Sequence, residues 1–213
     1  MTTARDTILN RVKAALTTAR FPEVRDVKVP PFALEHATAT ECVERFLSEL
    51  SLLGVTVHQE STGAEVCTRV ESLIHGQRVL SWQPASLPYD LLHVLMGQEV
   101  MTPGATKEEK ATAAIGLTGV DAAIAETGSL CLLSSGAHAR SASLLPAVHV
   151  AVVREDQIVA TMGMFFERFA PRIRESSCLN IVTGPSRTAD IELTLTLGVH
   201  GPGKLIVVLG PAE

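Results

Sequence analysis

Two glycine-bearing turns near the end of the sequence carry residue types that bind anions. The first, "GPSRTAD", runs from Gly184 to Asp190. A Gly-Pro turn that leaves a strand and opens a helix exposes the first backbone N–H groups of that helix, which attract anions. Ser186 and Thr188 would cap these groups, and Arg187 would add a two-pronged contact to a phosphate or carboxylate. The alternative is an ordinary capped helix start, with Asp190 at its positive end and a solvated arginine.

The second turn, "GVHGP", places His200 between Gly198 and Gly201. Flanking glycines let backbone approach the imidazole closely, so His200 is a candidate general base or anion-binding group. The alternative is a helix C-cap in which one glycine takes the left-handed conformation. We expect a buried helix between the two turns, and a straight helix would separate Ser186 from His200 by about 20 Å. The turns therefore share a site only if that helix is short or broken.

A carboxylate and a second arginine lie further upstream. Glu126 precedes Thr127 and Gly128 between two apolar runs, where it is a candidate general base or nucleophile, or else caps a hairpin turn. Arg140, in "HARSASLLP", would supply another anion contact or would be solvated. The histidines lack His-x-x-x-His spacing and the four cysteines lack a Cys-x-x-Cys pair. The sequence therefore predicts no metal site, no cluster of its own and reduced, packed thiols.

The elements that must position these residues alternate between helix and strand. Residues 5–19 have the spacing of an amphipathic helix, and the proline-containing segment 21–36 reads as a connecting arm. A capping box at 38–41 predicts the start of a second helix, which ends at Gly54. A strand, another helix and another strand are predicted to follow. "CLNIVT" and "LIVVLG" are buried strands that flank the two turns, and open α/β sheets place ligands next to strand ends. We predict an α/β fold with a mostly parallel sheet flanked by helices, divided into 1–37 and 38–213.

Composition narrows the function classes. The 213 residues are 46% hydrophobic and 19% charged, enough to close a sizeable core. A formal charge of −5 argues against a nucleic-acid or anionic-membrane partner, because these need clustered Lys and Arg. No apolar run reaches the roughly 18 residues of a membrane helix, and the first residues lack a signal-peptide core. We expect a cytoplasmic protein.

Four motifs, in this order and spacing, carry a family resemblance: "TGVDAAIAETGSLCLLSS", "RSASLLPAVHVAVV", "TGPSRTADIE" and "LGVHGPGKLIVVL". They resemble the lactate-utilization C-subunit family, the short members of the lactate-utilization (LUD) domain proteins. The match spans about 113–209. The resemblance implies a fold of the NagB/RpiA/CoA-transferase-like kind. Its matching residues are Glu126 to Gly128, Arg140, Pro146, Gly184 to Asp190 and His200 to Pro202. Many members have Asp where Glu126 stands, which keeps the carboxylate but shortens its reach.

The resemblance also implies a role in oxidising L-lactate to pyruvate with two separate iron–sulfur proteins. The chain would then be a cluster-free subunit whose Arg187 and His200 turns hold a small carboxylate or a partner's acidic group. The alternative is a stand-alone enzyme or binder for a phosphorylated or CoA-linked molecule, since the implied superfamily includes sugar-phosphate isomerases and CoA transferases. Whether the chain is catalytic, and its oligomeric state, stay open at this point.

Overall fold

A computed structural model describes residues 3–19, 34, 36–189 and 195–213. The chain divides into two compact units, Met1–Pro31 and Phe32–Glu213. The first contains α1 (Ala4–Thr18), which Thr3 and Asp6 cap reciprocally, and this confirms the predicted N-terminal helix. The apolar side chains of α1 are exposed: Ile8, Leu9, Val12 and Leu16.

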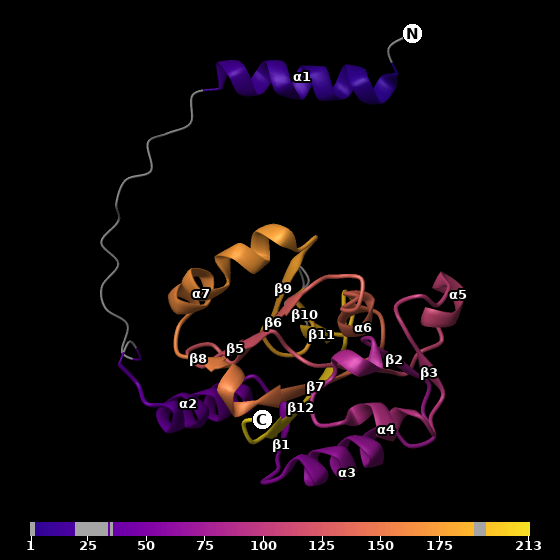
Figure 1. Cartoon of the computed structure of the whole chain (residues 1–213), viewed down its shortest axis with the longest axis vertical. Coiled ribbons are helices and arrows are strands. Elements are labelled where there is room, and N and C mark those ends of the chain that lie inside the picture. The colour runs from indigo at the N-terminus through magenta and orange to yellow at the C-terminus, as the bar shows by residue number, and fades with distance from the viewer. Residues whose placement is uncertain (1–2, 20–33, 35, 190–194) are drawn as a thin grey trace. The chain divides into compact units, whose positions relative to one another are not determined.

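The second unit is built on a six-stranded, fully parallel sheet, which confirms the predicted fold class (Figure 1). Its strands, in spatial order, are β1 (Thr56–Gln59), β12 (Lys204–Gly210), β7 (Val148–Arg154), β4 (Ile115–Thr118), β2 (Val79–Ser81) and β3 (Val100–Met101). The central strands are Val- and Ile-rich and buried, as strands covered on both faces must be. In register, His149 of β7 lies between Gly116 of β4 and Leu205 of β12, so these three residues share one face.

A second, four-stranded sheet was not indicated by the sequence. Its order is β8 (Ile158–Val159), β5 (Ala122–Ile124), β6 (Ser129–Leu133) and β9 (Leu179–Val182). The β5–β6 and β6–β9 pairs are antiparallel, while β5 and β8 are parallel. Phe165 and Phe169 of α7 (Met162–Glu175) pack on this sheet in a small core separate from the main one.

The remaining helices are α2 (Ala39–Leu52), α3 (Gly63–Ile74), α4 (Leu91–Leu95), α5 (Lys107–Lys110) and α6 (Ser141–Leu144), with 3-10 turns η1 (Pro84–Ser86) and η2 (Glu155–Gln157). The predicted capping box of α2 is present. Helices cover both faces of the main sheet, with α3 and α4 opposite α7 and the second sheet (Figure 1). A Cβ on Gly116 would lie 1.8 Å from the carbonyl oxygen of Ala142, so the glycine lets α6 lie directly on β4.

The predicted helix between the two turns is wrong. β10 (Arg187–Ala189) pairs antiparallel with β11 (Leu195–Leu197), and residues 190–194 lie outside the described residues. The segment "IELTLTL" alternates apolar and polar residues with period two and contains β-branched threonine, a pattern typical of strands. The distance argument against a shared site therefore does not apply.

Among the described residues, no helix is long and apolar enough to cross a membrane.

Candidate ligand cavity

The two turns meet at one cavity of about 300 Å³. The N–H of Ser186 donates to the carbonyl of Pro202 at 2.9 Å, and the N–H of Gly198 donates to the carbonyl of Ser186 at 3.0 Å. Gly184, Ser186, Arg187 and His200 all line the cavity. Because β10 and β11 run antiparallel, the chain returns to Ser186 at Gly198, and this brings together turns that a straight helix would have held apart.

His149 lines the cavity from the main sheet. Its side chain is 1% exposed, and its Nε2 lies 2.9 Å from the hydroxyl of Thr118. Among the described residues, its Nδ1 has no hydrogen-bond partner. Burial lowers the pKa of His149 to about 4, so the imidazole is neutral at pH 7. Sequence reasoning missed this residue, although a histidine inside the apolar run "VHVAVV" was a signal of a buried polar group.

A chain of hydroxyls connects the predicted Thr127 to the cavity wall. The hydroxyls of Thr127 and Ser129 are 2.7 Å apart, and the Ser129 and Thr183 hydroxyls are also 2.7 Å apart. Thr183 lines the cavity. Thr127 therefore reaches the site through Ser129 and not directly.

Arg187 has a structural contact in addition to its place on the cavity. Its guanidinium donates to the carbonyl of Leu53, at the end of α2. Cationic side chains commonly satisfy the last carbonyls of a helix in this way. The guanidinium carries further donors and is exposed, so the predicted anion contact stays a prediction.

Two predicted glycines serve packing against the same helix. Gly128 and Gly184 both have positive φ, 62° and 80°. A Cβ on Gly128 would lie 2.9 Å from Glu49 Cβ, and one on Gly184 would lie 3.3 Å from Leu53 Cβ. Both turns therefore need glycine for backbone conformation and for their approach to α2.

Two other predicted residues, Glu126 and Arg140, are not part of the cavity lining. Glu126 accepts from the N–H of Met162 at 3.0 Å, at the positive N-terminal end of α7. It lies in the β5–β6 turn, but the hydrogen bond of its carboxylate is to α7 and not to the hairpin that the alternative expected. Arg140 directly precedes α6, and its carbonyl accepts from the Ser143 hydroxyl. Neither residue lines the cavity. Asp190, like the side chain of Thr188, lies outside the described part of the structure.

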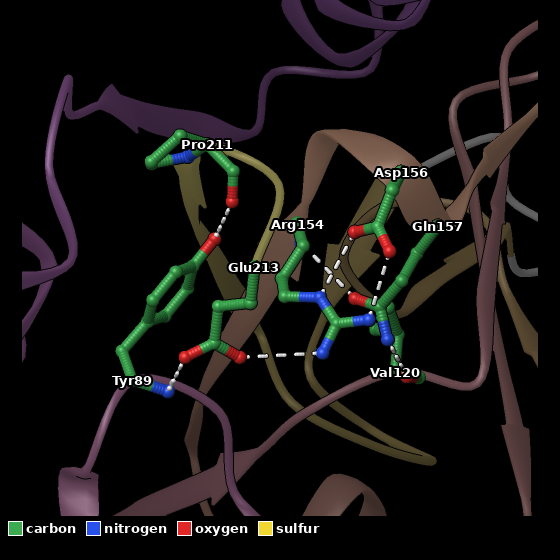
Figure 2. A network of polar contacts seen from close by, with 7 residues as sticks. All are labelled: Tyr89, Val120, Arg154, Asp156, Gln157, Pro211 and Glu213. Atoms are coloured by element: carbon green, nitrogen blue, oxygen red, sulfur yellow. Dashed lines mark hydrogen bonds and ion pairs between the residues drawn. The ribbon is translucent and has the colours of Figure 1, made fainter.

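The cavity lies near the amino ends of β7 and β12, whereas open α/β sheets usually bind ligands beyond the carboxyl ends. The carboxyl ends of these two strands are instead occupied by paired polar groups (Figure 2). Tyr89 donates its hydroxyl to the Pro211 carbonyl and its N–H to Glu213, and Glu213 also pairs with Arg154 at 3.3 Å. Arg154 is held in turn by Asp156 at 2.9 Å.

A larger cavity, of about 500 Å³, lies beside Asp121, which follows β4. Asp121 accepts from the N–H of Leu133 at 2.7 Å and from the guanidinium of Arg172. Glu175 adds a second carboxylate to the lining. His138, on the same lining, stacks on Trp82 with ring centroids 3.9 Å apart. Because its arginine is already neutralised by a carboxylate, this cavity does not favour an anionic ligand.

All four cysteines are free thiols, and burial raises the pKa of Cys131 to about 12. Within the described ranges, no group of three or more His, Cys, Asp or Glu side chains is arranged to hold a metal ion. The absence of a cluster in this chain stays a prediction.

Comparisons with known proteins agree with the family resemblance that the sequence motifs indicate. Residues 43–209 match the family model described as the LUD domain. Lactate utilization protein C of Halalkalibacterium halodurans is 30% identical over 218 residues, which cover 93% of this chain and 94% of that protein. Lactate utilization protein C of Deinococcus radiodurans is 41% identical over 127 residues, or 59% of this chain and 60% of that protein. The crystal structure of a DUF162 family protein from Deinococcus radiodurans superimposes with a TM-score of 0.66 and 29% identity, covering 81% of this chain and 98% of that one.

Proposed function

The chain belongs to the LUD domain family, and on this premise we propose that it acts in lactate utilization as a subunit of an iron–sulfur L-lactate-oxidising system. In this system the chain carries no cluster and works with two separate iron–sulfur proteins. The names of its relatives support the role in lactate utilization. The iron–sulfur partners are part of the proposal.

One observation carries the proposed role of the site: the two turns that resemble the family signature line the same cavity. A volume of about 300 Å³ is at the small end of ligand pockets and suits a small organic acid. His200 and Arg187, both exposed, lie where an entering carboxylate would meet them. We assign these two residues to the carboxylate.

Reconstitution tests the proposal. The purified chain, without partners, is expected to show no lactate oxidation, measured by reduction of an artificial electron acceptor. Adding the two iron–sulfur proteins should produce pyruvate from L-lactate, and leaving out this chain should remove that activity. Oxidation by the isolated chain, or equal activity without it, would contradict the proposal.

A phosphorylated or CoA-linked ligand is the alternative. The cavity beside Asp121 is larger, but its Arg172 is already paired with Asp121, and the carboxylate of Glu175 would repel a phosphate. Thermal unfolding with sugar phosphates, coenzyme A, lactate and pyruvate separates the alternatives, because a bound ligand stabilises the fold. Stabilisation by a phosphorylated compound alone would favour the second function.

A further inference from the structure

His149, which lines the cavity, has a buried polar atom that its described surroundings leave unsatisfied. A buried donor or acceptor without a partner destabilises a fold, so native structures rarely contain one. Ser81 Oγ and Asn180 Nδ2 are the other two such side-chain atoms among the described residues, and neither residue lines this cavity. His149 thus combines burial, an Nδ1 without a partner and a place on the lining of a ligand-sized cavity.

We propose that His149 Nδ1 binds the uncharged oxygen on the second carbon of a small hydroxy or oxo acid, whose carboxylate stays near His200 and Arg187. The ligand class rests on the proposed function. The assignment to His149 rests on the unpartnered nitrogen and on its contact with Thr118.

The charge of the ligand decides which end faces His149. A neutral imidazole cannot neutralise a carboxylate, and moving an unpaired carboxylate into a buried position is strongly unfavourable. The exposed cationic guanidinium of Arg187 is at the turns, whereas His149 is 1% exposed. The carboxylate therefore binds at the turns, and an oxygen without charge reaches the imidazole.

Thr118 lets the imidazole serve two kinds of oxygen. Its hydroxyl can donate to Nε2 or accept from it, so either tautomer of His149 is compatible with this contact. When Nε2 carries the proton, Nδ1 accepts from a ligand hydroxyl. When Nδ1 carries it, the ring donates to a ligand carbonyl. One site can thus hold both a hydroxy acid and the corresponding oxo acid.

Calorimetric titration of the full chain with L-lactate, pyruvate and propionate tests the assignment, because propionate lacks the oxygen on the second carbon. The wild type should bind the first two acids about tenfold more tightly than propionate, as expected for one hydrogen bond to a buried group. His149→Leu should reduce the affinities for lactate and pyruvate to the propionate level and leave the affinity for propionate unchanged. Equal affinity for all three acids in the wild type, or an unchanged preference in His149→Leu, would overturn it.

Two near-isosteric variants separate binding from packing. His149→Asn keeps a hydrogen-bonding atom near the Nδ1 position, whereas His149→Gln keeps one near Nε2, which faces Thr118. We expect the asparagine variant to retain most of the preference for lactate and the glutamine variant to lose it. Equal loss in both, with unchanged thermal unfolding, would show that Nδ1 has no specific role. His75→Leu, an exposed position on α3's C-cap, is the matched control.

The two proposals fail in different ways. If the reconstituted system does not oxidise lactate but the acids still bind with the His149-dependent preference, only the proposed function is wrong. If lactate oxidation requires the chain and His149→Leu changes neither binding nor preference, only the assignment of His149 is wrong.

Discussion

The amino and carboxyl ends of β7 and β12 differ in how their polar groups are used. At the carboxyl ends, Tyr89, Arg154 and Glu213 all have partners, and a Cβ on Gly210 would lie 2.6 Å from the side chain of Val66. At the amino ends, a cavity opens and His149 keeps a nitrogen without a partner among the described residues. The direction of a parallel sheet therefore does not by itself identify a candidate ligand site. A cavity and unsatisfied polar groups are the better guide to such a site.

The largest effect is expected from displacing α6, whose Ser143 and Leu144 line the cavity. Gly116→Ala would place a Cβ 1.8 Å from the Ala142 carbonyl oxygen, and backbone on both sides would have to shift. We expect a loss of about 3 kcal/mol in the free energy of unfolding, measured in urea. Gly97→Ala, where nothing lies within 4 Å of the new Cβ, is the control. A loss below about 1 kcal/mol would mean that α6 adapts easily.

The pH dependence of stability reports on His149, at the amino ends of the strands. The folded-state pKa is lowered to about 4 from 6.5, so only the unfolded chain takes up this proton as the pH falls from 6.5 towards 4. Stability should decrease over that interval by up to about 3 kcal/mol and stop responding to this group below it. The double variant Thr118→Val with His149→Leu should lose this part of the slope. Parallel curves for wild type and variant would show that folding does not lower the pKa of His149.

A smaller effect is expected at the opposite ends of the strands. Tyr89→Phe leaves the Pro211 carbonyl without its donor and should destabilise the fold by about 1 to 2 kcal/mol without changing binding of the acids. Burial raises the pKa of Tyr89, so its contribution is present below pH 10 and is lost as the pH rises above it.

Tyr89 is the only tyrosine in the sequence, so absorbance at alkaline pH reports its titration directly. Phenol ionisation near pH 10 in the folded protein would show that this side chain is open to solvent. Weakened acid binding in Tyr89→Phe would show that the two ends of the strands are coupled.

The smallest effect concerns Arg187. Arg187→Ala removes the contact with the Leu53 carbonyl, and because the side chain is exposed we expect a loss of about 1 kcal/mol or less. Binding of lactate, pyruvate and propionate should weaken together, because all three share the carboxylate. Arg187→Lys should restore the charge but not the two-pronged geometry. Unchanged affinities in the alanine variant would leave the arginine with its role at the end of α2 alone.

The sequence was informative where local pattern and tertiary structure agree. Capping residues and terminal glycines correctly predicted α2, and apolar runs predicted the parallel sheet. The strand pair β10–β11 was missed because its flanking turns resemble helix caps, although the alternation between them favours strands. The second sheet was missed because pairing of β6 with β9 depends on residues far apart in the sequence.

The candidate site was predicted only in part, for a related reason. The turns at Ser186 and His200 contain recognisable glycine patterns, so the sequence pointed to them directly. His149 belongs to no sequence motif. It is a candidate because it is buried and because its Nδ1 has no partner among the described residues. Those properties exist only in three dimensions. Glu126 was a candidate by residue type, and the structure places it against the α7 N-terminus.

The hydroxyl chain from Thr183 through Ser129 to Thr127 would couple the cavity to the turn between β5 and β6. Each hydroxyl can donate or accept, so the three can point their protons in either direction with the same number of hydrogen bonds. A ligand group that donates to Thr183 would select one direction, and a group that accepts would select the other. The turn between β5 and β6 would then register whether a donor or an acceptor occupies the cavity, through reoriented protons and without movement of the backbone.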